Sequence, residues 1–131
     1  SQPEVIVKVV GGQKTEPFEE VTDTRIRFMD YCGNPLAGIK GHLELLQDPK
    51  FQKIRGNEAR PEKIRKIWKE FFRRVKVFME KGFEPTPGIT KENLQQLLTY
   101  ENNDPLEEDN FKKVESLYES IISPQHQKSN K

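Results

Sequence analysis

Residues 60–83 constrain the fold most, because periodicity, charge and end signals all indicate one long amphipathic helix there. The apolar residues recur at spacings of three and four, which places them on one stripe of an α-helix: Ile64, Ile67, Trp68, Phe71, Val75, Phe78 and Met79. Pro61 suits the first helical position, and Gly82 followed by Phe83 suits the C-terminal end. Such a stripe has to be buried, so we expect the rest of the chain to pack around this helix.

Two further helices are expected after it. Thr90 is a good N-cap for a short helix over residues 91–100, with Ile89 and Leu94 as a hydrophobic staple. Residues 104–107 (Asp-Pro-Leu-Glu) have the form of a capping box, and the helix they open is expected to end before Pro124. Its predicted buried stripe is Leu106, Phe111, Val114, Leu117, Tyr118, Ile121 and Ile122.

The N-terminal part favours strands instead. Residues 4–10 (EVIVKVV) are rich in β-branched side chains and end at two glycines, which is typical of a strand followed by a turn. Residues 24–29 (TRIRFM) resume an alternating pattern.

Residues 36–46 fit either a helix or a strand. As a helix, the segment would have Asn34 as its cap and Pro35 at the first position. As a strand, it would avoid the cost of about 1 kcal/mol for each of two glycines, Gly38 and Gly41, inside a helix. The turn before it, Asp30-x-x-Gly-Asn-Pro-Leu-x-Gly, resembles strand-joining turns of immunoglobulin-like and transthyretin-like modules. We favour the strand.

These elements predict an α+β fold, in which a small N-terminal β-sheet or hairpin packs against a C-terminal bundle of three helices. The chain has 131 residues, enough for one domain, which we expect over residues 1–123, with a disordered tail over residues 124–131. No run of 18 apolar residues occurs, so no transmembrane helix is expected. The single cysteine favours a reducing, intracellular compartment, and the start at Ser1 suggests a piece of a longer protein.

The net charge of +1 hides a strong segregation of charge along the chain. Residues 50–81 contain twelve Lys or Arg and four Glu, a net charge of +8. A stripe of cations on the outer face of the central helix, extended by the loop before it, would contact the phosphates of a nucleic acid. The predicted contact residues are Lys50, Lys53, Arg55, Lys66, Lys69, Arg73 and Lys76.

One alternative competes with this hypothesis. Acidic residues of the last helix could pair with the basic face, and the module would then bind another protein through an apolar patch or the edge of the N-terminal strand. If the face is functional, Lys69 and Arg73 should not pair with carboxylates of the last helix. Phe72 and Val77 are the candidates for stacking on bases, unless a wide buried stripe includes Phe72.

Catalytic and metal sites find little support in the sequence. Cys32 and His42 lack a recognisable nucleophile motif, and His126 lies in the expected tail. The only loose cluster of metal-ligand types is Asp30, His42 and Glu44. We therefore expect a non-enzymatic binding module without a cofactor, a small-molecule substrate or a membrane partner, and with an oligomeric state that the sequence does not define.

Overall fold

The structure, a computed structural model, describes residues 27–81 and 88–129, with side chains as far as residue 123. Four α-helices follow one another in these ranges: α3 (Phe28–Gln47), α4 (Arg60–Lys81), α5 (Lys91–Leu98) and α6 (Asn110–Ser129). Two short 3-10 turns, η2 (Pro49–Phe51) and η3 (Asn57–Ala59), lie between α3 and α4. None of the described helices is long and apolar enough to cross a membrane.

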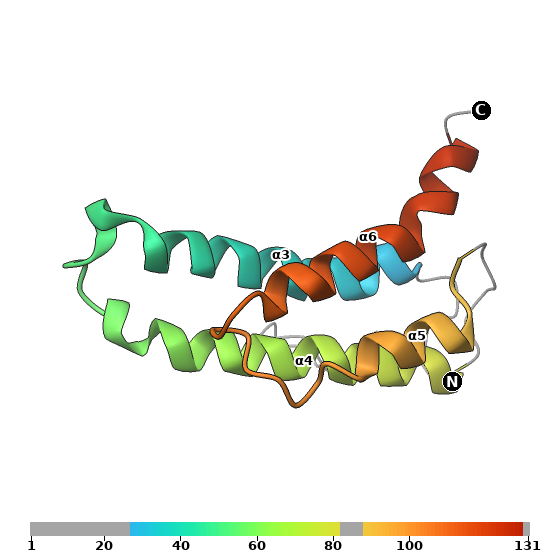
Figure 1. The fold of residues 1–131 in the computed structure, drawn as a ribbon, viewed down its shortest axis with the longest axis horizontal. Coiled ribbons are helices and arrows are strands. Elements are labelled where there is room, and N and C mark those ends of the chain that lie inside the picture. Colours follow the sequence, from blue (N-terminus) through green and yellow to red (C-terminus); the bar gives the residue numbers. More distant parts are fainter. Residues whose placement is uncertain (1–26, 82–87, 130–131) are drawn as a thin grey trace, which may run out of the picture.

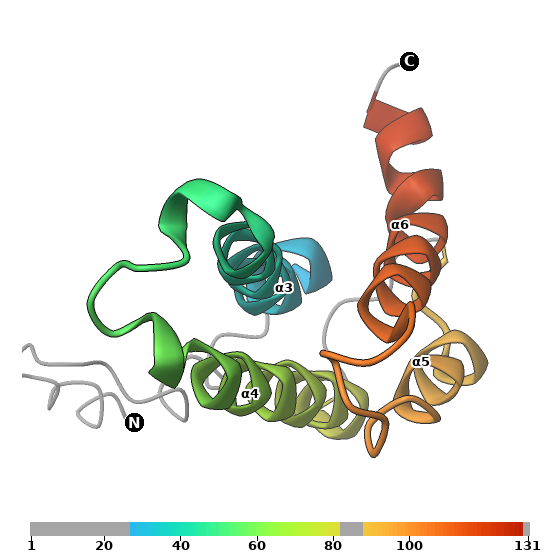
Figure 2. The ribbon, with the colours of Figure 1, turned by 60° about the vertical axis from the view of Figure 1, so that its left-hand side comes forward.

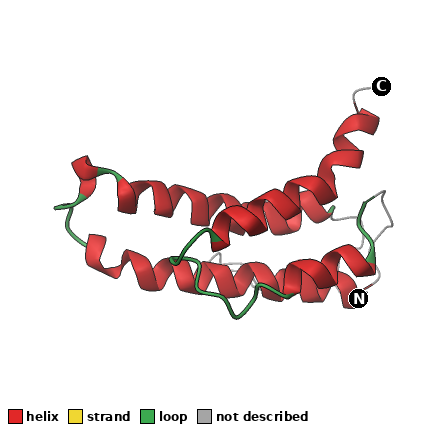
Figure 3. Ribbon diagram, in the orientation of Figure 1, coloured by secondary structure: helices red, strands yellow, loops and turns green. Residues whose placement is uncertain are grey.

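Helices α3 and α4 run antiparallel as a long hairpin (Figure 1). Helix α5 packs on α4, and α6 packs on α3 and α5, so both lie beside only one half of the hairpin (Figure 2). The other half ends in the loop of residues 48–59, which forms the tip of the hairpin (Figure 3).

The central helix is confirmed as α4, and its predicted stripe forms the core. Trp68 is 2% exposed and Phe71 is fully buried, so the predicted helix phase is right. Their rings meet that of Phe72 edge to face at centroid separations of 5.0 Å. Tyr118 of α6 lies against Phe28 of α3 and Phe71, which joins three helices in one aromatic cluster. The predicted end at Gly82 and Phe83 lies outside the described residues.

The α+β prediction is wrong for the part of the chain that the structure describes, which contains helices and no strand. Residues 36–46, read as a strand, lie inside α3, and Phe28 and Met29 form its first turn. The buried residues of α3 follow a helical period that runs through the supposed turn at Gly33 to Pro35: Phe28, Tyr31, Cys32, Pro35, Leu36 and Ile39. The proposed strand over residues 4–10 lies outside the described residues.

Helix α5 begins as predicted, because the Thr90 hydroxyl accepts a hydrogen bond from the Asn93 backbone N–H at 3.1 Å. The predicted start of α6 is wrong. Asp104 accepts a hydrogen bond from the Leu106 N–H at 3.0 Å and forms a local turn, and α6 begins six residues later at the buried Asn110. Its backbone also continues past Pro124 to Ser129. The single domain over residues 1–123 stays a prediction.

Candidate nucleic-acid interface

The outer face of α4 carries the predicted cations at spacings of three and four, opposite the buried stripe. Lys66, Lys69 and Lys76 are exposed, while Arg73 is partly buried. From residue 66 to residue 76 the row covers about 15 Å of helix at 1.5 Å per residue. The structure therefore brings these four predicted residues together along one ridge.

Arg73 is held by a carboxylate of its own helix. Its Nε and Nη2 donate to the two oxygens of Glu70 at 3.0 and 2.6 Å, and Arg74 Nε donates to Glu70 Oε2 at 2.9 Å. The hydrogen bond from Arg73 lowers the pKa of Glu70 most, and the hydrogen bond from Arg74 lowers it further. Partial burial of the carboxylate raises this pKa, but by less than the hydrogen bonds lower it. The bond to Glu70 likewise raises the pKa of Arg73. Arg73 is thus partly neutralised in the folded chain.

Two acidic residues after α5 also pair with cations of α4, one with Lys76 of the ridge and one with Arg65 beside the ridge. Lys76 Nζ lies 2.8 Å from Glu101 Oε2, and Arg65 donates to both oxygens of Asp104 at 3.3 and 3.1 Å. The hydrogen bond from Arg65, together with the one from the Leu106 N–H, lowers the pKa of Asp104. These two pairs contribute little stability but reduce the positive charge of α4.

The alternative, in which carboxylates of α6 neutralise the basic face, does not occur among the described residues. Within them, Glu115 is the α6 carboxylate that forms an ion pair, and its partner is Lys40 of α3 at 3.4 Å. Five of the predicted cations have no ion-pair partner in this part of the chain, namely Lys50, Lys53, Arg55, Lys66 and Lys69.

Hydrogen bonds hold the loop that carries three of these cations. Gln52 Nε2 donates to the Leu46 carbonyl at 2.9 Å, which fixes the loop to the end of α3. Arg60 Nε donates to Asn57 Oδ1 at 2.9 Å, and Arg60 Nη1 donates to Nδ1 of His42 at 2.7 Å. Gly56 has φ +86°, a left-handed conformation that favours glycine. The loop therefore has a defined shape.

The aromatic candidate for base stacking is wrong. Phe72 is fully buried between Trp68 and Phe71, because the stripe of α4 is wide enough to include it. Val77 is partly buried against the core. Base stacking by these two side chains would require α4 to leave its place in the fold.

A large apolar residue that the sequence analysis missed is exposed in the loop. Ile54 is 38% exposed between Lys53 and Arg55. The sequence does carry a signal for this exposure, because Ile54 is an isolated apolar residue between basic residues of a loop. In contrast, no local pattern marks Glu101 and Asp104 as partners of α4, since the pairs join residues 25 and 39 positions apart.

The other candidate residues lie apart from this surface. Cys32 is fully buried in α3, where burial raises the pKa of its thiol, so the native fold gives no reactive thiolate there. Asp30 and His42 are separated by about 18 Å along the helix at 1.5 Å per residue. Within the described ranges, no group of three or more acidic, His or Cys side chains could hold a metal ion. The His126 side chain lies outside the described part.

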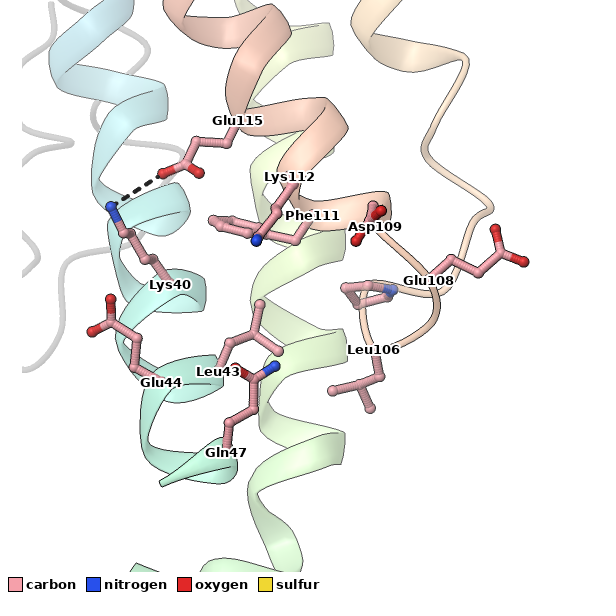
Figure 4. Close-up of a pocket in the computed structure, with 11 residues that line it drawn as sticks. Lys40, Leu43, Glu44, Gln47, Leu106, Glu108, Asp109, Phe111, Lys112 and Glu115 are labelled. Carbon is pink, nitrogen blue, oxygen red and sulfur yellow. Dashed lines mark ion pairs between the residues drawn. The ribbon is translucent and has the colours of Figure 1, made fainter. Parts of the chain in front are cut away.

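A groove of about 270 Å³ lies between α3 and the start of α6 (Figure 4). The apolar side chains that line the groove are Leu43 of α3, Leu106 of the loop before α6, and Phe111 of α6. The ion pair between Lys40 and Glu115 spans one end of the groove. The charged residues at its rim are Lys40, Glu44, Glu108, Asp109, Lys112 and Glu115. Its rim is therefore more acidic than basic.

Comparisons with family models, with curated proteins and with solved structures give no match.

Proposed function

We propose that this chain is a non-catalytic binding module that contacts the phosphate backbone of a nucleic acid through the ridge of α4 and the loop before it. The supporting observation is the group of five exposed cations without an ion-pair partner in the described part of the chain, Lys50, Lys53, Arg55, Lys66 and Lys69. Each such cation that neutralises a phosphate releases counterions, which makes binding favourable and sensitive to salt.

Arg73 and Lys76 belong to the same ridge but have a smaller expected role. Arg73 would have to leave Glu70, and Lys76 would have to leave Glu101, before either could give its full charge to a phosphate. Replacing Arg73 by Glu would also place two carboxylates side by side and disturb the fold. The informative substitutions are therefore at Lys66 and Lys69.

The test is fluorescence polarisation with labelled single- and double-stranded oligonucleotides over a range of salt concentrations. For the double variant Lys66→Gln/Lys69→Gln, we expect the log–log salt slope on duplex DNA to shrink by about 1.8, or 0.9 for each phosphate that the variant leaves without a cation. The matched control is Lys112→Gln/Lys113→Gln, two exposed lysines of α6, which should leave the slope unchanged. Equal slopes for wild type and the ridge variant, or no binding below about 100 μM at low salt, would refute the proposal.

The alternative is a protein partner, for which the groove between α3 and α6 provides a specific observation. It combines apolar side chains with four carboxylates and two lysines, so it would suit a basic segment with apolar side chains. Two results together would support this alternative. The wild-type chain would bind no oligonucleotide, and the substitution Leu43→Glu would abolish its binding to a protein partner.

A further inference from the structure

The loop at the tip of the hairpin combines three features of a contact element. It lies at the end of α3 and α4, beyond the half of the hairpin that α5 and α6 accompany (Figure 1). It exposes Lys50, Lys53 and Arg55 without an ion-pair partner among the described residues. It also exposes Ile54, which is the large hydrophobic residue that the described part of the chain leaves most open to solvent.

An exposed apolar side chain flanked by cations suits a particular chemistry. Proteins that bind the minor groove use Arg and Lys to read its pattern and width, and they often insert apolar side chains such as Ile or Leu between base steps. Further along the chain, the ridge of α4 carries cations from residue 66 to residue 76, over about 15 Å of helix. A row of that length matches a linear polyanion better than a planar lipid surface, which only the tip would touch.

Building on the proposed function, we propose that the partner is a duplex nucleic acid and that the loop at the tip enters one of its grooves. Ile54 then contacts sugars and base edges in the groove, and Lys53 and Arg55 bind the flanking phosphates. Lys66 and Lys69 follow the backbone further along the duplex.

Local hydrogen bonds prepare the loop for this contact. The Lys50 N–H donates to Asp48 Oδ1 at 3.0 Å, and Gln52 Nε2 donates to the Leu46 carbonyl at 2.9 Å. On the other side, the Asn57 N–H donates to the Ile54 carbonyl at 3.0 Å. A loop that is already ordered loses less conformational freedom on binding. Gln52 is therefore a positioning residue for Ile54 and its neighbours.

The experiment separates the apolar contact from the ionic contacts through salt dependence. For Ile54→Ser we expect duplex affinity to fall about tenfold at every salt concentration, with an unchanged slope, because an apolar contact releases no counterions. Ile54→Leu should restore affinity to within about threefold of the wild type. For Lys53→Gln/Arg55→Gln we expect the slope to shrink by about 1.8.

Further measurements separate a structural effect from a binding effect. Ile54→Ser should unfold close to the urea concentration of the wild type, since Ile54 is 38% exposed and lies outside the hydrophobic core. Gln52→Ala retains every charge and should weaken duplex binding about threefold without a change of slope, because it only loosens the loop.

The possible outcomes distinguish this inference from the proposed function. Duplex binding that depends on Lys66 and Lys69 but is unaffected by Ile54→Ser and Lys53→Gln/Arg55→Gln overturns the inference and leaves the proposed function standing. Equal or tighter binding to single strands also overturns the inference. Absence of all oligonucleotide binding overturns both, and binding to phosphatidylserine vesicles that depends on Ile54 would then identify an anionic membrane as the target.

Discussion

Gly33 lies where α3 comes closest to the phenol of Tyr118. A Cβ atom at position 33 would lie 2.7 Å from the Tyr118 hydroxyl oxygen, closer than side-chain atoms approach. The ring cannot move away easily, because it packs on Phe28 and Phe71 and its hydroxyl donates to the Met29 carbonyl at 3.3 Å. The absence of a side chain at residue 33 is therefore a packing requirement.

We expect Gly33→Ala to lower the free energy of unfolding by about 1–2 kcal/mol, because the cost of overpacking exceeds the gain in helix propensity. Gly41→Ala is the matched control in the same helix, since nothing lies within 4 Å of a Cβ there. It should raise the free energy of unfolding by about 0.5–1 kcal/mol. Urea unfolding followed by circular dichroism measures both changes. Stabilisation by both substitutions would show that Tyr118 gives way.

At the scale of the element, α3 contains a proline that its partner helix accommodates. Pro35 has no N–H, so it cannot donate to the carbonyl of Tyr31 four residues earlier. Arg74 Nη1 of α4 donates to that carbonyl at 2.7 Å, and its guanidinium lies over the Tyr31 ring at 4.9 Å. Glu70 orients Arg74 from the other side. The hydrogen bond that the proline removes from α3 is thus replaced from α4.

This replacement predicts a coupling between Pro35 and Arg74. In the wild-type background, Arg74→Met should cost about 1.5–3 kcal/mol, because it removes a charged donor from a backbone carbonyl next to the core. In the Pro35→Ala background the N–H of residue 35 can serve that carbonyl, so the cost should be smaller by about 1 kcal/mol. A double-mutant cycle by urea unfolding measures the difference. Equal costs in the two backgrounds would show that the carbonyl does not need Arg74.

The same contact explains why the sequence analysis recovered α4 but not α3. The helix signals of α4 are local, because its apolar spacing, its charges and Pro61 all lie within one segment. In α3, the order Gly33-Asn34-Pro35 indicates a turn locally, and the residue that makes a helix possible there is Arg74, 43 positions away in contact with Tyr31. Local propensity was overridden by packing that no single segment reveals.

The candidate interface could be predicted from the sequence to a similar extent. Helical spacing placed Lys66, Lys69, Arg73 and Lys76 on one ridge, and the structure agrees. Spacing alone could not show that Glu101 would pair with Lys76 of that ridge, or that Asp104 would pair with the neighbouring Arg65, because both carboxylates reach α4 only through the fold. It also could not distinguish the buried Phe72 from the exposed Ile54.

At the scale of the whole molecule, titratable groups form hydrogen bonds with the first residue of α4 and with its middle turns. His42 of α3 accepts from Arg60 at the first residue of α4, and only a neutral imidazole can accept this bond. Partial burial, and then the charges of Arg60 and Lys63, lower the pKa of His42 below its usual 6.5. The carboxylate of Glu70 accepts hydrogen bonds from Arg73 and Arg74, and the carboxylate of Asp104 accepts them from Arg65. These bonds lower the pKa values of both carboxyl groups.

These shifts predict that stability falls in two separate steps as the pH falls. The His42 pKa is lower in the folded than in the unfolded chain, so the unfolded chain takes up the proton first, and stability falls once the pH drops below about 6.5. For Glu70 and Asp104, whose ordinary values are 4.5 and 3.8, the contribution is complete above those values and is lost as the pH falls through their folded values. The urea midpoint should therefore fall once as the pH drops below about 6.5 and again as the pH drops below about 4.5.

The substitution His42→Gln is the matched control, because the glutamine amide oxygen can still accept a hydrogen bond from Arg60 but does not titrate near neutral pH. The variant should lose the upper step and keep the lower one. If the upper step persists in His42→Gln, another group must be responsible for it, and if the wild type shows no upper step, the bond between His42 and Arg60 does not hold the tip of the hairpin.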